Sequence, residues 1–131
     1  MRRLLDASVV LAHIYGEPLA PEVDVARAEG CFIASINLAE VTRRLGRDGH
    51  GEIARSVSDQ FNAAIVPLTE EMALRAGQLA HSFRRYDLSL ADACCLATAE
   101  SFDAVALTTD RAWTRLPANW SDRVRVVRPV T

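Results

Sequence analysis

The sequence has 131 residues, half of them hydrophobic and 24% charged, which suffices for one substantial core but hardly for two, so we expect one domain over residues 1–131. All fifteen basic residues are arginines, so no lysine is available for a Schiff base or a P-loop phosphate clamp. Guanidinium groups suit phosphate, but a formal net charge of −2 identifies no partner by itself.

Short apolar runs alternate with helical patterns along the whole chain, which is typical of an α/β domain with a largely parallel sheet. We expect five strands, at residues 3–6, 31–35, 64–67, 104–108 and 124–128. Helices are expected to begin near Ser8, Pro21, Asn37, Gly51, Thr69 and Ser89, with a short one after Asp110. Residues 118–123 are predicted to form only a surface turn.

The first fourteen residues place two arginines before an apolar run, as a signal peptide would, but Asp6 interrupts the run and no cleavage pattern follows. We interpret this segment as a buried strand that leads into a helix. No other apolar run approaches the length of a membrane span. Cys94 and Cys95 are helix neighbours in poor geometry for a disulfide, and Cys31 leaves an odd count. We therefore expect a soluble cytoplasmic protein with reduced thiols.

Four acidic residues each have a structural explanation. Asn37-Leu-Ala-Glu40 and Ser89-Leu-Ala-Asp92 match the pattern of a capping box. Asp110 follows a predicted strand and could cap the short helix after it. Asp6, which ends an apolar strand, is the hardest of the four to explain by capping alone.

The predicted topology brings these acids together. Asp6 and Asp110 follow strands, whereas Glu40 and Asp92 lie in the first turns of helices that leave the carboxyl edge of the sheet. Open α/β sheets bind their ligands at this edge. Clustered carboxylates repel one another unless a cation neutralises them, and oxygen ligands favour Mg²⁺ or Mn²⁺ over zinc. Such an ion can activate water for in-line attack on phosphorus, so the pattern favours phosphoryl chemistry.

Around the acids the sequence resembles the PIN-domain ribonucleases, and more closely the VapC-type toxins of bacterial type II toxin–antitoxin systems. The resemblance rests on LLDASVVLA at Asp6, SINLAEV at Glu40, DLSLADACCLATA at Asp92 and LTTDRAW at Asp110, in this order over nearly the whole chain. It implies a three-layer α/β/α sandwich with strand order 3-2-1-4-5. It also implies a Mg²⁺- or Mn²⁺-dependent endoribonuclease that cleaves structured RNA of the translation apparatus, either tRNA or rRNA.

The same resemblance implies partners and supporting residues. It implies a homodimer that is inhibited by a cognate VapB-type antitoxin, whose tail would cover the acidic groove. Ser8, Asn37 and Thr108 could orient the acids, although capping and turn formation explain them equally well. Tyr86 is a candidate for base stacking. The candidates for RNA phosphate contacts are Arg43, Arg44, Arg84, Arg85 and Arg111.

Two other classes of function fit this sequence less well. A response-regulator receiver domain has a similar size and an acidic pocket, but it needs a lysine, which this chain lacks. A nucleotide-binding module needs a glycine-rich phosphate loop, and the segment after Asp6 has no glycine. Three alternatives stay open: a PIN-fold nuclease that acts on DNA, one that acts in general RNA processing, and a catalytically silent nucleic-acid-binding domain of the same fold.

Overall fold

A single five-stranded sheet forms the centre of the protein, as the computed structural model, which describes residues 1–129, shows. The strands are β1 (Arg3–Leu5), β2 (Cys31–Ala34), β3 (Ala63–Val66), β4 (Val105–Thr108) and β5 (Val124–Val126). They pair in the order β3-β2-β1-β4-β5, and every pair is parallel. The predicted sheet and its strand order are therefore confirmed.

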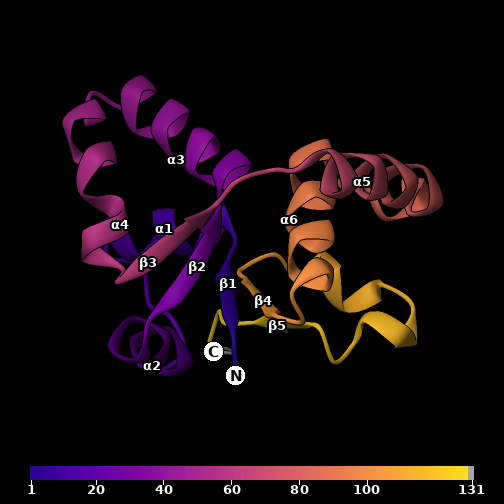
Figure 1. Ribbon diagram of the computed structural model, residues 1–131. Helices are drawn as coiled ribbons and strands as arrows, with labels where there is room; N and C mark the ends of the chain where they lie inside the picture. The colour runs from indigo at the N-terminus through magenta and orange to yellow at the C-terminus, as the bar shows by residue number, and fades with distance from the viewer. Residues whose placement is uncertain (130–131) are drawn as a thin grey trace.

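Helices cover both faces of this sheet and complete the predicted α/β/α sandwich (Figure 1). One face carries α1 (Ala7–Ile14), α2 (Glu22–Glu29), α3 (Ser35–Arg47), α4 (Val57–Gln60) and the 3-10 helix η1 (Gly51–Ser56). The other face carries α5 (Glu70–Ser82), α6 (Leu90–Ser101) and the 3-10 helices η2 (Arg84–Tyr86), η3 (Arg111–Arg115) and η4 (Ala118–Trp120). Among the helices of residues 1–129, none has the length and apolar character that a bilayer span requires.

The two central strands are buried on both faces. Successive side chains of a strand point to opposite sides of a sheet. Leu4 accordingly packs in the core beneath α5 and α6, while Leu5 packs in the core beneath α1 to α4, and both are fully buried. Ala106 and Leu107 of β4 divide between the two cores in the same way. The strand that carries Leu5 therefore delivers the next residue, Asp6, to the carboxyl edge with only 5% of its surface exposed.

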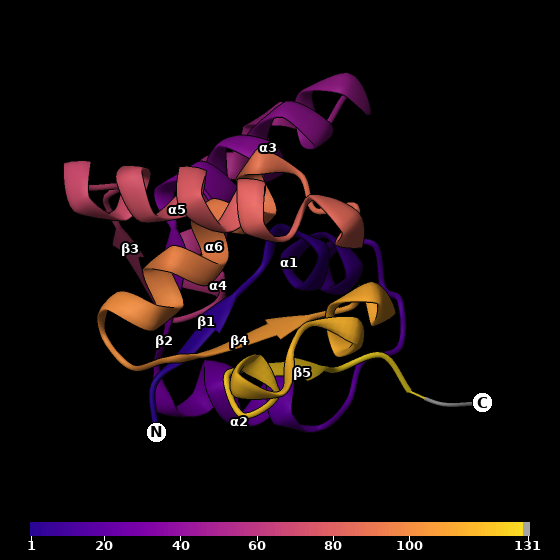
Figure 2. The ribbon, with the colours of Figure 1, turned by 90° about the vertical axis from the view of Figure 1, so that its right-hand side faces the viewer.

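Helix α6 lies between α5 and the strands, and both views show this (Figures 1 and 2). Its residues from Ala93 to Ala99 are all buried, and most of them are small, so the helix approaches the sheet closely. Leu90 at its start, however, is 65% exposed. Cys94 and Cys95 lie in this core, whereas Cys31 lies in the core on the opposite face.

Residues 118–123 form more than the predicted surface turn, which covers only residues 121–123. The segment contains η4, and Trp120 at its end is only 3% exposed. The Trp120 ring packs edge-to-face on Phe83, with the ring centroids 5.9 Å apart. The segment is too short to show a helical period, so Trp120 alone gave no recognisable pattern in the sequence.

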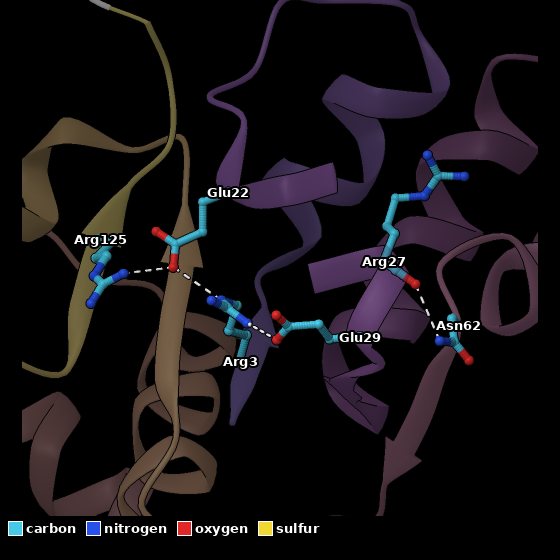
Figure 3. A network of polar contacts seen from close by, with 6 residues as sticks. All are labelled: Arg3, Glu22, Arg27, Glu29, Asn62 and Arg125. Atoms are coloured by element: carbon cyan, nitrogen blue, oxygen red, sulfur yellow. Dashed lines mark hydrogen bonds and ion pairs between the residues drawn. The ribbon is translucent and has the colours of Figure 1, made fainter. Parts of the chain in front are cut away.

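A network of ion pairs joins the first and last strands to α2 (Figure 3). Arg3 of β1 donates hydrogen bonds to Glu22 and Glu29 at 3.0 Å each, and Arg125 of β5 donates to Glu22 at 2.6 Å. The hydrogen bond that Arg3 donates to Glu22 is the main reason why the pKa of Arg3 is raised. Because the Arg3 side chain is only 11% exposed, this guanidinium holds the fold together and is not available to a ligand.

Candidate active site

The carboxyl edge of the sheet carries a cavity of about 600 Å³ that is lined by all four of the acids singled out in the sequence. Asp6 follows β1 and Asp110 follows β4, while Glu40 extends from α3 and Asp92 from α6. Asp6 is buried, Glu40 and Asp92 are half-buried, and Asp110 is exposed. The parallel topology explains this arrangement, because the strand ends and the helix starts share one edge.

Two hydroxyl groups hold the Asp6 carboxylate. Its Oδ2 atom accepts hydrogen bonds from Ser8 Oγ at 2.7 Å and from Thr108 Oγ1 at 3.0 Å. The Ser8 hydroxyl in turn accepts a bond from the backbone N–H of Thr109 at 3.0 Å. Asp6 stands at the N-cap position of α1, but its side chain makes no capping bond. Two of the predicted supporting residues, Ser8 and Thr108, therefore contact the acid that they were expected to orient.

Glu40 is held by Asn37, although not as a capping box. Helix α3 begins at Ser35, two residues earlier than predicted, and Ala34 occupies the N-cap position without a side-chain capping bond. Asn37 thus lies inside the helix, fully buried, and its Nδ2 donates to Glu40 Oε1 at 2.8 Å. The two residues are one helical turn apart, which is why their side chains meet. Within the described chain, the buried Oδ1 atom of Asn37 has no hydrogen-bond partner.

The other two acids do cap helices, as their sequence patterns indicate. Ser89 and Asp92 form a reciprocal capping box at the start of α6, with both hydrogen bonds at 3.0 Å. Asp110 Oδ1 accepts from the backbone N–H of Ala112 at 2.9 Å at the start of η3. In Asp92 and in Asp110 only one of the two carboxylate oxygens accepts a capping bond, so a cap and a ligand contact do not exclude one another.

Burial in the cavity makes three of its carboxylates, Asp6, Glu40 and Asp92, hard to ionise. Burial, followed by the charges of Asp92 and Glu40, raises the pKa of Asp6 to about 6, although the Ser8 and Thr108 hydroxyls oppose the rise. Burial also raises the pKa of Glu40 and of Asp92, and a neighbouring carboxylate adds to the rise in each case. None of the ion pairs formed within residues 1–129 involves one of these four acids. The four acids therefore share the cavity without an ion-pair partner of their own among the described residues.

The donor set fits a hard divalent cation. It consists of carboxylate oxygens, which Mg²⁺ and Mn²⁺ prefer. In the part of the chain that the structure describes, however, no group of three or more His, Cys, Asp or Glu side chains already stands in a metal-binding arrangement. Hydrogen bonds to Ser8, Asn37 and Ser89 occupy the side chains of three of the acids. The side chains would therefore have to rotate toward a shared ion.

Arginines line the cavity beside the acids. Arg43, Arg44 and Arg47 reach it from the end of α3, and Arg128 reaches it from the segment after β5. Arg111 lines an adjoining cavity of about 430 Å³, which Arg128 shares. Three of the predicted phosphate contacts, Arg43, Arg44 and Arg111, are thus brought to or beside the site.

Two predicted arginines are not brought there. Arg84 and Arg85 lie on η2, outside the lining of the cavity, and Arg84 donates to the backbone oxygen of His81 at 2.8 Å. Conversely, sequence reasoning missed Arg47 and Arg128. The signal for Arg47 was present, because it follows Arg43 by four residues and so shares its helix face. No local pattern marks Arg128, which depends on where β5 lies in the sheet.

The chain is similar to known proteins in both its sequence and its fold. The PIN domain family model matches residues 3–119 of this chain. No curated protein matches the sequence. Solved structures with a similar fold include DNA-bound VapBC from Salmonella typhimurium, with 19% identity and a TM-score of 0.74 over 95% of this chain and 97% of the other.

Two further solved structures have the same fold. VapC20 from Mycobacterium tuberculosis, described as a sarcin-ricin loop cleaving toxin, is 14% identical, with a TM-score of 0.71 over 97% of this chain and 99% of the other. VapBC2 from Rickettsia felis, bound to a DNA fragment from their promoter, is 19% identical, with a TM-score of 0.70 over 89% and 94%. At these identities the likeness establishes the three-layer fold.

Proposed function

This chain belongs to the PIN domain family, and from that premise we propose that it is a metal-dependent endoribonuclease that serves as the toxin of a toxin–antitoxin pair. One observation carries the proposal: Asp6, Glu40, Asp92 and Asp110 line one cavity, and no ion pair within residues 1–129 neutralises them. A cavity that concentrates negative charge in this way needs a cation before it can receive a phosphodiester.

The four carboxylates would hold Mg²⁺ or Mn²⁺. Such an ion, when bound, supplies activation of water and stabilisation of the oxygen that leaves phosphorus. The chain's own hydroxyl and amide groups set the geometry. Ser8 and Thr108 keep the Asp6 carboxylate at the floor of the cavity, and Asn37 holds Glu40 at its wall. These contacts are those expected of residues that orient metal ligands.

The arginines would position the nucleic acid. Arg44 and Arg47 are engaged by Asp48, with N–O distances of 3.0 Å and 3.3 Å. Arg43 and Arg128 line the same cavity and form no ion pair within the described residues. Their guanidinium groups are therefore the ones free to bind phosphates on either side of the cut.

The structural relatives support a substrate class and a partner. A similar protein described as cleaving the sarcin-ricin loop supports structured RNA of the translation apparatus, rRNA or tRNA, as the substrate. Similar chains in VapBC complexes support a VapB-type antitoxin. The acidic cavity suits a basic antitoxin segment that would cover the carboxylates. The homodimer stays a prediction.

The purified protein with Mg²⁺ is expected to cut a structured RNA at one or a few sites and to leave a 5′-phosphate and a 3′-hydroxyl. Attack by water on phosphorus, with departure of the 3′ oxygen, produces these ends. Ligation of the fragments to adapters that require each kind of end measures them, and excess EDTA is the control.

Other outcomes of this experiment point elsewhere. A 2′,3′-cyclic phosphate would show that the 2′-hydroxyl of the RNA attacks, which requires no ion at the carboxylates. Equal cleavage of the matched DNA would favour the DNA nuclease. Binding of RNA without any cleavage, by a protein that unfolds cooperatively, would favour a silent nucleic-acid-binding domain.

A further inference from the structure

Tyr15 presents an aromatic ring at the same cavity as the four acids. It follows the last turn of α1, lines the cavity and is 40% exposed. No sequence pattern marks it, because the apolar pattern of α1 does not tell whether the ring that follows this helix is buried or exposed. The ring is thus an apolar surface inside a cavity whose other lining groups are mostly charged or polar.

The ring is held in place by its neighbours before any ligand arrives. The Tyr15 hydroxyl donates to Asp48 Oδ2 at 2.5 Å, and the same carboxylate pairs with Arg44 and Arg47. The guanidinium carbon of Arg44 is 5.8 Å from the centre of the Tyr15 ring, a cation–π distance. His50 approaches the ring edge-to-face, with the centroids 6.4 Å apart. A ring held in this way loses little conformational freedom on binding.

A nucleobase is the ligand that these surroundings fit. Unpaired bases stack on exposed aromatic rings, and the adjacent phosphates need guanidinium groups. Tyr15 offers the ring, and Arg43 and Arg128 offer the guanidinium groups within one cavity. We propose that Tyr15 stacks on one unpaired base beside the phosphate that is cut, so that the RNA must be single-stranded at that nucleotide. This inference rests on the proposed ribonuclease function.

The second tyrosine provides a matched control. Tyr86 is half-buried on η2 and packs edge-to-face on Phe83, with the centroids 5.8 Å apart, and it does not line the cavity. It was the tyrosine that the sequence favoured for stacking, and the structure places it away from the acids. Truncation of Tyr86 therefore removes an aromatic ring of the same kind without removing a ring from the cavity.

The test combines changes in the protein with changes in the RNA. The cut site of the parent protein is first mapped on a hairpin RNA. An abasic nucleotide is then placed, one position at a time, at each nucleotide flanking this site. Single-turnover cleavage rates below saturation are measured with Mg²⁺ for the parent, Tyr15→Ala, Tyr15→Phe and Tyr86→Ala, and thermal unfolding checks that each variant is folded.

We expect one abasic position to slow the parent about tenfold or more, which is typical of the loss of one stacked base. Tyr15→Ala should slow cleavage of the intact RNA to a similar extent and should show no further loss at that abasic position. Tyr15→Phe, which keeps the ring without the hydroxyl, and Tyr86→Ala should both keep the sensitivity of the parent.

The possible failures are distinguishable. If the parent cuts RNA but Tyr15→Ala keeps the full abasic profile, the stacking proposal is wrong and the ribonuclease function stands. If Tyr15→Ala folds poorly, the test rests on Tyr15→Phe. Loss of the sensitivity to abasic nucleotides in Tyr15→Phe would then overturn the proposal. If the parent protein cuts no RNA, the proposed ribonuclease function is wrong, and so is this inference.

Discussion

Replacing Asp6 or Asp92 by asparagine is expected to abolish RNA cleavage while the protein stays folded. Asparagine has nearly the shape of aspartate but lacks its charge, so a hard cation loses a ligand that it prefers. We expect a loss of more than about a hundredfold, because even residues that only support a metal ligand cost 10- to 100-fold. At position 92 the asparagine side-chain oxygen still accepts the backbone N–H of Ser89, so the start of α6 is retained.

Stability and activity should therefore respond differently in these variants. Without metal, thermal unfolding should stay nearly unchanged or move upward, since burial and neighbouring charges disfavour the ionised acids. Mg²⁺ should stabilise the parent protein by binding its folded state and should stabilise both variants far less. Asp122→Asn, at an exposed acid outside the cavity lining, is the control and should behave like the parent.

The same experiment can also show that Asp92 has only a structural role. If Asp92→Asn cleaves RNA as well as the parent does, or unfolds much more readily without metal and keeps its specific activity, then Asp92 is a helix cap and no more. The capping box of α6 is already present in the structure, so this alternative is a concrete one.

The metal-free protein is expected to lose stability as the pH rises from about 4 to about 6. The pKa of Asp6 is about 6 in the folded protein and 3.8 in an exposed chain. Between these values the unfolded chain releases its proton while the folded protein keeps it, so rising pH favours unfolding. Stabilisation is complete below pH 3.8 and is lost as the pH passes through 6. The full difference corresponds to about 3 kcal/mol of unfolding free energy.

Urea unfolding in EDTA at a series of pH values measures this effect. Since whole domains are stable by only about 5–15 kcal/mol, a loss of this size is readily detected. The Asp6→Asn variant should show a much flatter pH dependence, because its side chain does not titrate. Asp48, whose pKa is lowered to about 2 chiefly by the Tyr15 hydroxyl, acts below this window and in the opposite direction. An Asp6→Asn protein with the same slope as the parent would contradict the prediction.

The sequence predicted the sheet and the edge that carries the acids, because both follow from local patterns. The apolar run that ends at Asp6 and the Ser89 to Asp92 box are readable in a few residues each. Asn37 was misplaced because the start of α3 depends on how the chain leaves β2, which a capping pattern does not report. The local pattern identified the acid Glu40 correctly as a residue near a helix start but gave it the wrong hydrogen-bond geometry.

Two other residues that line the cavity, Tyr15 and Arg128, were less predictable than its four acids. Tyr15 and Arg128 arrive from the end of α1 and from the segment after β5, which are far apart in the chain. Their meeting depends on strand order and on the packing of the last strand, and no single segment encodes it. Conversely, Arg84 and Arg85 form a local cluster of charge seven to eight residues before Asp92 in the sequence, yet they lie on η2 outside the lining of the cavity.

The three buried cysteines give the helical layer on each face of the sheet its own chemical reporter. Cys31 is 3% exposed in the core beneath α1 to α4, whereas Cys95 is fully enclosed in the core beneath α5 and α6. Burial raises the pKa of both thiols, so neither reacts with a thiol reagent until its own layer opens. Labelling rates at the two positions would therefore separate local opening of one layer from unfolding of the whole domain, without any residue being introduced for the purpose.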